Sequence, residues 1–307
     1  IKKEMEPTLL LPMGFGAILV NLPLSGAVTQ LTDAAKNALV AAGINYQGMT
    51  TTELKDVFST LDFTGHIFEE GPIDVLFNAG IANELFPLIL FIGIGAMIDF
   101  GPLLSNPKLM LFGAAAQFGI FAVLLVASQF FTLQEAGSLA IIGGADGPTA
   151  IFTTLKLAPH LLAPIAIAAY SYMALVPVII PLVVKLTCSK KELMINMKEQ
   201  DKLYPSKTEF KNMRALKIIF PIAVTTIVAI IVPDAVSLVG MLMFGNLIKE
   251  IGANTSRLFE TASNGIMNAA TIFLGLSVGA TMTVDAFLNF QTLGIVAGGF
   301  LAFGFSI

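Results

Sequence analysis

Residues 141–152 read IIGGADGPTAIF, and this stretch decides how the rest of the sequence is interpreted. Two glycines followed by Asp-Gly-Pro do not support a continuous helix, because proline removes a backbone donor and clashes with the preceding turn. We therefore expect one half-helix to end near Gly143 and Gly144. A second half-helix should begin with Pro148 in its first turn, where the missing N–H costs nothing.

Asp146 is the one charged residue of the surrounding apolar run, 136–155. If this run lies in a membrane, broken backbone is tolerated only where protein buries it or where it lines a wet cavity. The Asp146 carboxylate and the exposed carbonyls would then be hard oxygen ligands for a small cation, and an ionisable residue in such a place favours a functional role. The alternative is that Asp146 only caps a helix at the membrane interface.

The composition indicates a membrane protein. Of 307 residues, 55% are hydrophobic and 12% are charged, and the mean hydropathy is +0.82. Soluble domains carry about twice that share of charge. The net charge of -4 and the pI near 5.2 argue against a nucleic-acid partner. Cys188 is the only cysteine, which excludes an intrachain disulfide and a cysteine-based metal cage.

Spanning helices need roughly 20 mostly apolar residues, and the sequence predicts an all-α polytopic membrane protein with about nine membrane segments. Charge-free runs of this size occupy 7–32, 109–134, 157–184, 261–284 and 286–307. Shorter candidates occupy 75–98, which contains Glu84, and 136–155, 218–233 and 235–248.

Two polar stretches separate these segments. An acidic insertion at about 25–80 contains a predicted short helix over Thr50–Phe58. A stretch rich in lysine, 188–217, is predicted to be a cytoplasmic loop by the positive-inside rule. Acidic charge contributes little to orientation, so the side of the acidic insertion stays open.

The chain contains a weak internal repeat. Residues 13–19 (MGFGAIL) are similar to 242–248 (LMFGNLI), and 91–97 (FIGIGAM) to 273–279 (FLGLSVG). The halves run parallel if every intervening segment crosses the membrane, and antiparallel if 136–155 is re-entrant. We favour the inverted arrangement with broken, re-entrant helices. We thus expect one transmembrane domain over 1–307, incomplete at both ends, with a first repeat at 7–187 and a truncated second repeat at 218–307.

Further polar residues lie inside apolar runs. Asn268, Thr271 and Ser277 belong to the charge-free run 261–284, and the first two share a helix face. An ion path and interhelical hydrogen bonding explain them equally well. Tyr170 and Tyr172 lie near the middle of another apolar run, which suggests a polar cavity, with a structural hydrogen bond between helices as the alternative.

The stretch 143–149 (GGADGPT) closely resembles the signature of the beta subunits of sodium-pumping biotin-dependent decarboxylases. This family includes the oxaloacetate, methylmalonyl-CoA, glutaconyl-CoA and malonate decarboxylases. Residues 93–104 (GIGAMIDFGPLL), 169–175 (AYSYMAL) and 274–279 (LGLSVG) are also similar to it, in the same order.

The resemblance implies a membrane subunit that decarboxylates carboxybiotin, consumes a proton and exports sodium ions. A carboxyltransferase alpha subunit would load CO2 onto biotin, which a separate subunit or domain carries because this chain lacks an Ala-Met-Lys-Met acceptor. It further implies a small membrane gamma subunit, lipid contacts, an oligomer and the bacterial cytoplasmic (inner) membrane. The rival interpretations are a sodium-coupled secondary transporter of an organic anion and a membrane scaffold without transport.

The resemblance also implies roles for particular residues. Asp146 matches the family's sodium-binding and coupling aspartate, and Tyr172 joins it as a catalytic candidate. Tyr170 is the candidate contact for the cofactor. The candidate sodium-binding residues are Asp146, Asn268, Ser277, Thr271, Gly143, Gly144 and Thr149, with Asp146 and Asn268 as direct metal ligands.

Overall fold

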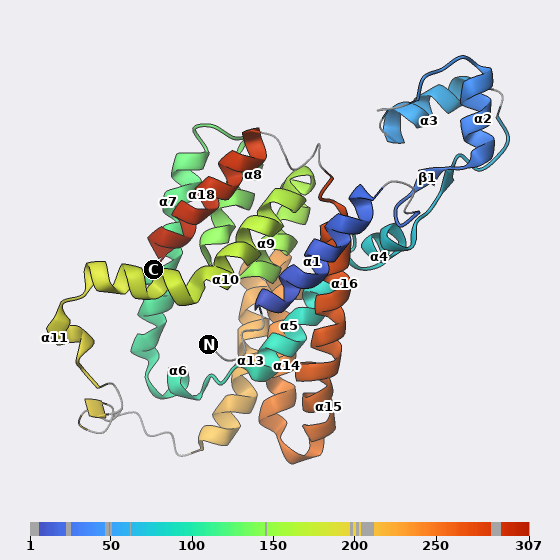
Figure 1. Cartoon of the computed structure of the whole chain (residues 1–307). Helices are drawn as coiled ribbons and strands as arrows, with labels where there is room; N and C mark the ends of the chain where they lie inside the picture. Colours follow the sequence, from blue (N-terminus) through green and yellow to red (C-terminus); the bar gives the residue numbers. More distant parts are fainter. Residues whose placement is uncertain are drawn as a thin grey trace.

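The structure is a computed structural model, and helices dominate the part of the chain that it describes (Figure 1). The described residues are 6–22, 26–46, 49, 51–61, 63–144, 146–196, 199–200, 203, 212–283 and 290–306. Much of the predicted basic loop, at 197–198, 201–202 and 204–211, therefore lies outside the described residues.

The elements of the first part of the chain are α1 (Glu6–Asn21), β1 (Gln30–Leu31), α2 (Asp33–Ala41), α3 (Thr51–Thr60), β2 (Phe68–Glu69), α4 (Pro72–Gly80), α5 (Leu85–Met97), α6 (Gly101–Ser105), α7 (Met110–Ala127) and α8 (Leu133–Ala140). They are followed by η2 (Ile141–Gly144), α9 (Gly147–Leu157), α10 (Leu162–Thr187), α11 (Lys190–Leu193), α13 (Met213–Ile231), α14 (Val236–Ile251), α15 (Ser256–Glu260), the π-helix η6 (Thr261–Ile266), α16 (Met267–Ala280) and α18 (Phe290–Ser306). Short 3-10 turns occur at Pro107–Leu109, Pro159–Leu161, Pro233–Ala235 and Ala253–Thr255.

The acidic insertion folds as a small unit that stands apart from the helical bundle (Figure 1). Its helices α2 and α3 share a core of Ala35, Leu39, Leu54 and Phe58. The helix α3 confirms the prediction for Thr50–Phe58. The antiparallel pair β1–β2 departs from the all-α prediction, and it joins the two ends of the insertion.

Within the residues that the structure describes, two helices, Pro107–Ala127 and Met213–Ile231, are long and apolar enough to cross a membrane. The helices α4 and α5 form a third candidate if they count as one span, bent by 63° at its break. A helical membrane protein therefore fits, but the predicted count of nine segments is not confirmed. Breaks explain part of the difference, because they divide predicted runs such as 75–98 and 136–155 into helices too short to span alone.

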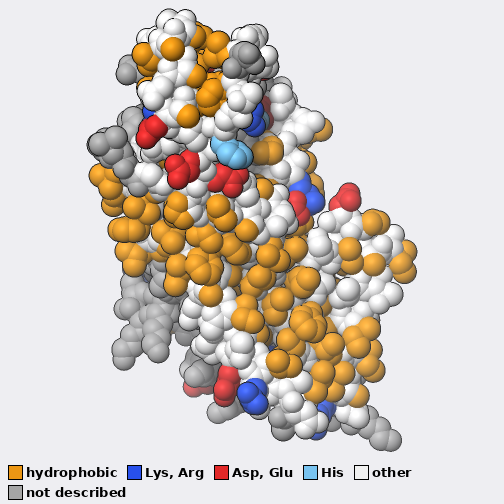
Figure 2. Space-filling view, turned by 90° about the vertical axis from the view of Figure 1, so that its right-hand side faces the viewer, with side chains coloured by type: hydrophobic (Ala, Val, Ile, Leu, Met, Phe, Trp, Pro, Cys, Tyr) orange, Lys and Arg blue, Asp and Glu red, His pale blue; other side chains and the backbone are white. Residues whose placement is uncertain are grey.

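The surface is arranged as a membrane protein requires. Figure 2 shows a broad belt of hydrophobic side chains on one face, with charged side chains gathered above and below it. Large apolar side chains of α7, including Phe112, Phe118 and Phe121, are exposed. Such exposure would be unfavourable in water, whereas lipid solvates it without penalty.

Two helix pairs pack by the same close contact. In the pair α1–α16, a β-carbon on Gly16 would overlap the Leu276 carbonyl oxygen, and one on Gly279 would overlap the Met13 carbonyl oxygen. In the pair α14–α5, a β-carbon on Gly245 would overlap the Ile92 carbonyl oxygen, and one on Gly95 would overlap that of Leu242. Small residues permit such backbone approach between membrane helices.

These contacts make Gly16 equivalent to Gly245 and Gly95 equivalent to Gly279. The first equivalence agrees with the alignment of 13–19 with 242–248. The second equivalence differs by two residues from the alignment of 91–97 with 273–279. A repetitive apolar pattern does not determine the register of such an alignment.

The two helix pairs meet where α5 of one pair packs against α16 of the other, and these two helices run in opposite directions. Gly93, late in α5, contacts Met267 at the start of α16, whereas Phe86, early in α5, stacks on Phe273 with ring centroids 6.0 Å apart. The helices α5 and α16 are therefore antiparallel. The internal repeat itself stays a prediction.

Candidate functional site

The segment around Asp146 forms a helical hairpin. Thr132 and Glu135 form a capping box at the start of α8. The chain then leaves the α-helix at Ile141, runs through the 3-10 turn η2, and enters α9 at Gly147 with Pro148 in the first turn. The predicted break between two half-helices is confirmed.

The open ends of the hairpin lie together. His160 Nε2 lies 3.0 Å from Glu135 Oε1, so the residues just beyond α9 contact the start of α8. Gly137 in α8 also faces Leu157, since a β-carbon on this glycine would lie 3.2 Å from Leu157 Cδ1. Asp146 therefore belongs to the tip of the hairpin, at the end away from this ion pair.

Asp146 is half-buried and acts as the N-cap of α9. Thr149 donates two hydrogen bonds to it, from Oγ1 to Oδ2 at 2.6 Å and from the backbone N to Oδ1 at 3.5 Å. A carboxylate offers about four acceptor positions, so this cap leaves capacity for a cation. The capping geometry and a cation site are thus compatible, and the cap does not by itself decide between them.

The two tyrosines point to different neighbours. Tyr170 is buried against the hairpin tip, and a β-carbon on Gly147 would lie 2.5 Å from its ring atoms Cε1 and Cζ. The Tyr172 hydroxyl donates to the Val296 carbonyl of α18. Tyr170 therefore makes the closer contact with the residue that follows Asp146.

The predicted sodium-binding residues fall into two groups. Gly143 and Gly144 lie in η2 beside Asp146, and Thr149 binds its carboxylate. Among the described residues, no hydrogen bond or ion pair joins Asp146 to Asn268, Thr271 or Ser277 in α16.

Asn268 and Thr271 line a groove of about 680 Å³ between α1 and α16. The Thr271 hydroxyl donates within its own helix to the Met267 carbonyl at 2.8 Å. Ser277 is fully buried, and its hydroxyl has no hydrogen-bond partner within the described part of the chain. A polar group buried in this way is a candidate ligand contact.

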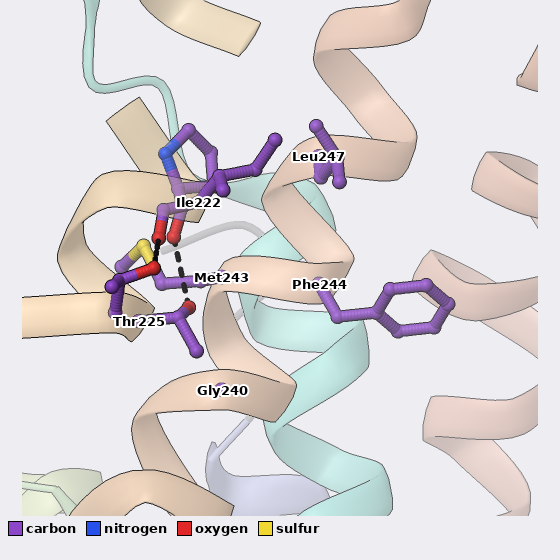
Figure 3. Close-up of a pocket in the computed structure, with 8 residues that line it drawn as sticks. Ile222, Thr225, Gly240, Met243, Phe244 and Leu247 are labelled. Atoms are coloured by element: carbon purple, nitrogen blue, oxygen red, sulfur yellow. Dashed lines mark hydrogen bonds between the residues drawn. The ribbon is translucent and has the colours of Figure 1, made fainter. Parts of the chain in front are cut away.

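A second cavity, of about 250 Å³, lies between α13 and α14 (Figure 3). Thr225 and Thr226 line it, but each hydroxyl donates to the carbonyl four residues earlier in α13. Apolar side chains including Met243 and Leu247 form most of its wall. We assign no ion site to this cavity because both hydroxyls are occupied by their own helix.

A charged cluster stabilises the end of α5 that precedes Asp99. Lys217 Nζ lies 2.7 Å from Asp99 Oδ1 and 3.7 Å from Glu250 Oε1. The hydrogen bond from Lys217, followed by that from the Gly101 backbone, holds the pKa of Asp99 below its ordinary value. Lys249 donates to the Ile98 carbonyl at 2.8 Å, as expected for a cation at a helix C-terminus. Asp99 is exposed and directly follows Ile98, the C-cap residue of α5.

We expect Glu135→Gln to lower stability in a pH-dependent way. His160, followed by Thr132, holds the pKa of Glu135 below its ordinary value of 4.5 by hydrogen bonding. The contribution of this carboxylate is therefore complete above pH 4.5 and is lost as the pH falls through its lowered folded-state pKa. The substitution should cost about 0.5–1 kcal/mol at neutral pH. Thermal unfolding measured from pH 7 downward checks this, with the exposed Glu260→Gln as control. An equal loss at every pH would contradict it.

One ion pair near the site involves residues to which the sequence assigned no role. Lys156, in the last turn of α9, lies 3.0 Å from Glu84 at the break between α4 and α5. The available signals were the single acid inside the run 75–98 and a lysine ten residues after Asp146. Neither signal predicts that the two meet.

The fold and the site together define a helical membrane protein whose broken hairpin carries an acidic residue at its tip. A family model of the Na+-transporting oxaloacetate decarboxylase beta subunit matches residues 1–307, so the chain belongs to this family. It is a membrane subunit of a sodium-translocating decarboxylase.

Characterised relatives agree with this assignment. The chain is 48% identical to the methylmalonyl-CoA decarboxylase subunit beta of Propionigenium modestum over 306 residues, which cover 99% of this chain and 71% of the relative. It is 45% identical to the oxaloacetate decarboxylase beta chain 2 of Salmonella typhi, covering 99% and 73% of the two chains. Identity to the methylmalonyl-CoA decarboxylase subunit beta of Veillonella parvula is 43%, covering 98% and 67%.

Proposed function

We propose that this subunit decarboxylates carboxybiotin presented by a partner and uses the reaction to export Na+ through a site at Asp146. The observation that carries the proposal is the hairpin tip, where an acidic side chain meets interrupted backbone in a chain of this family. During decarboxylation the carboxyl C–N bond breaks, CO2 leaves, and the electron pair stays on the ureido nitrogen, which takes up a proton. A desolvated membrane site can control the delivery of that proton.

Asp146 is the proposed coupling residue because its carboxylate can hold either Na+ or H+. Thr149 orients the carboxylate through two hydrogen bonds. Carbonyls of Gly143 and Gly144 are the proposed additional oxygen ligands, since η2 interrupts the regular α-helical bonding there. Coupling requires that the two ions occupy the site in different conformations.

Asn268, Thr271 and Ser277 are proposed to form a second part of the ion path, in α16, with Asn268 as a metal ligand there. Tyr172 is the proposed proton-path residue, and Tyr170 the proposed contact of carboxybiotin near the tip. The opposite directions of the pairs α1–α16 and α14–α5 support an inverted repeat, with α8–α9 as its re-entrant hairpin.

The proposed complex contains a biotin-carrying subunit or domain, a carboxyltransferase alpha subunit and a small gamma subunit, in the cytoplasmic membrane of a bacterium. The acid that is decarboxylated is chosen by the carboxyltransferase. The relatives indicate two candidate classes, oxaloacetate and methylmalonyl-CoA.

The test is 22Na+ uptake into inverted vesicles that contain the full complex. We expect uptake that requires decarboxylation and is blocked by avidin, and we expect Asp146→Asn to reduce it to background. Asp56→Asn, on the exposed surface of α3, is the matched control and should leave uptake unchanged. Uptake that avidin does not block would instead indicate a secondary transporter, and a fully active Asp146→Asn would show that Asp146 is only a helix cap.

A further inference from the structure

The helix α9 connects the proposed ion site to a second, distant contact. It begins directly after Asp146 and has 11 residues, so its ends are roughly 16 Å apart. Tyr170 packs against its first residue, Gly147, and Lys156 lies in its last turn. Because a short helix moves as a rigid body, a contact that fixes the Lys156 end also restricts the position of the Asp146 end.

Lys156 is held by two neighbours. Its Nζ lies 3.0 Å from Glu84 Oε1 and 5.1 Å from the centroid of the Phe152 ring, one turn earlier in α9. Phe152 is buried, and the Glu84 side chain is 21% exposed. The ring restricts the direction of the lysine side chain, which aims the ammonium group at one carboxylate.

Glu84 has an unusual backbone conformation. Its φ is 65°, and it is the only non-glycine residue with positive φ among the residues that the structure describes. A glutamate in this left-handed region costs about 1–2 kcal/mol, which glycine or asparagine would largely avoid. A partly exposed ion pair contributes about 0–1 kcal/mol, so the pair does not make glutamate the most stable choice here.

The location of Glu84 determines which parts of the fold the ion pair joins. Glu84 lies at the break between α4 and α5, where the chain bends by 63°. The helix α5 begins at the next residue, Leu85, and packs against α14 and, in the antiparallel direction, against α16. The ion pair therefore joins the hairpin that carries Asp146 to the bend of the helix packed at the centre of the bundle.

We propose that Glu84 and Lys156 are positioning residues that fix the outer end of α9 and thereby set the affinity of the Asp146 site for Na+. This inference rests on the proposed function of Asp146. It assigns neither residue a contact with the ion, because their effect passes through α9.

The test measures decarboxylation and 22Na+ uptake by the reconstituted full complex as a function of Na+ concentration. We expect Lys156→Met and Glu84→Gln each to raise the Na+ concentration for half-maximal rate by about tenfold, the size of a typical coupling between sites. The rate at saturating Na+ should change less than about twofold. Lys156→Arg should keep most of the wild-type affinity for Na+, because arginine can still pair with Glu84.

A double variant separates positioning from folding. Glu84→Gln with Lys156→Met leaves no unpaired charge, so it should assemble even if a single variant does not. The double variant should raise the Na+ concentration for half-maximal rate by the same factor as either single variant. Independent effects would instead raise it by the product of the two factors. Lys36→Met, which breaks the exposed Lys36–Asp33 pair in α2, is the control and should behave as wild type.

Three results would overturn the proposal: an unchanged Na+ requirement in the double variant, independent effects that multiply, or a loss of maximal rate that Lys156→Arg does not restore. These results differ from a failure of the proposed function of Asp146. That failure would appear as an Asp146→Asn complex that still transports Na+. As a readout independent of turnover, the midpoint of thermal protection by Na+ should shift in the same direction and by the same factor.

Discussion

Gly245→Ala is expected to prevent the folded subunit from accumulating in the membrane. The added β-carbon would overlap the backbone carbonyl oxygen of Ile92 and lie 2.9 Å from the Ala96 nitrogen. Both atoms belong to the backbone of α5, so no side-chain rotation relieves the overlap. The opposing Gly95 is equally tight against α14, and the helices must separate. We expect a loss of about 3 kcal/mol or more, measured as yield and thermal unfolding of the purified complex.

Gly240→Ala is the matched control, since Gly240 lies five residues earlier in the same helix. Its β-carbon would lie 3.6 Å from Thr225 Cγ2, which is an ordinary contact. Because alanine is the better helix former, this variant should be as stable as wild type or slightly more stable. If both variants accumulate equally, the close α14–α5 contact is not what holds this part of the bundle together.

The sequence predicted features that depend on neighbouring residues. The break before Asp146 follows from the local requirements of Gly143, Gly144 and Pro148, and Thr149 is placed to bond the cap residue three positions earlier. The predicted helix in the acidic insertion was local too. Membrane character followed from composition, which does not depend on the arrangement of helices.

Features that depend on the partner helix were not predictable. Glu84 and Lys156 are 72 positions apart in the chain, and the contact requires both the bend after α4 and the return of α9. The register between α5 and α16 was also inaccessible, because glycine and apolar residues recur at several spacings in both segments. Tyr170 and Tyr172 are nearly adjacent, yet only the fold shows which one contacts the hairpin tip.

Gly147→Ala is expected to abolish Na+ uptake while the subunit still assembles. The added β-carbon would lie 2.5 Å from Cε1 and Cζ and 2.8 Å from the hydroxyl oxygen of Tyr170. An aromatic ring in a packed core moves only with its surroundings, so the hairpin tip has to shift instead. A displacement of about 1 Å is enough to reduce a geometry-dependent reaction about 100-fold. Uptake of 22Na+ and Na+-dependent decarboxylation by the assembled complex measure this.

A second substitution shows how Tyr170 acts on the tip. Gly147→Ala combined with Tyr170→Leu removes the ring that the new methyl group would strike, and it should recover activity if Tyr170 acts by packing. No recovery, with Tyr170→Leu alone also inactive, would show that the phenol contacts carboxybiotin or the ion path directly. Gly294→Ala in α18, where nothing lies within 4 Å of the added carbon, is the control for a glycine replaced inside a helix. Because Gly147 adjoins Asp146, recovery by the double variant would show that the Asp146 site depends on where the tip is held.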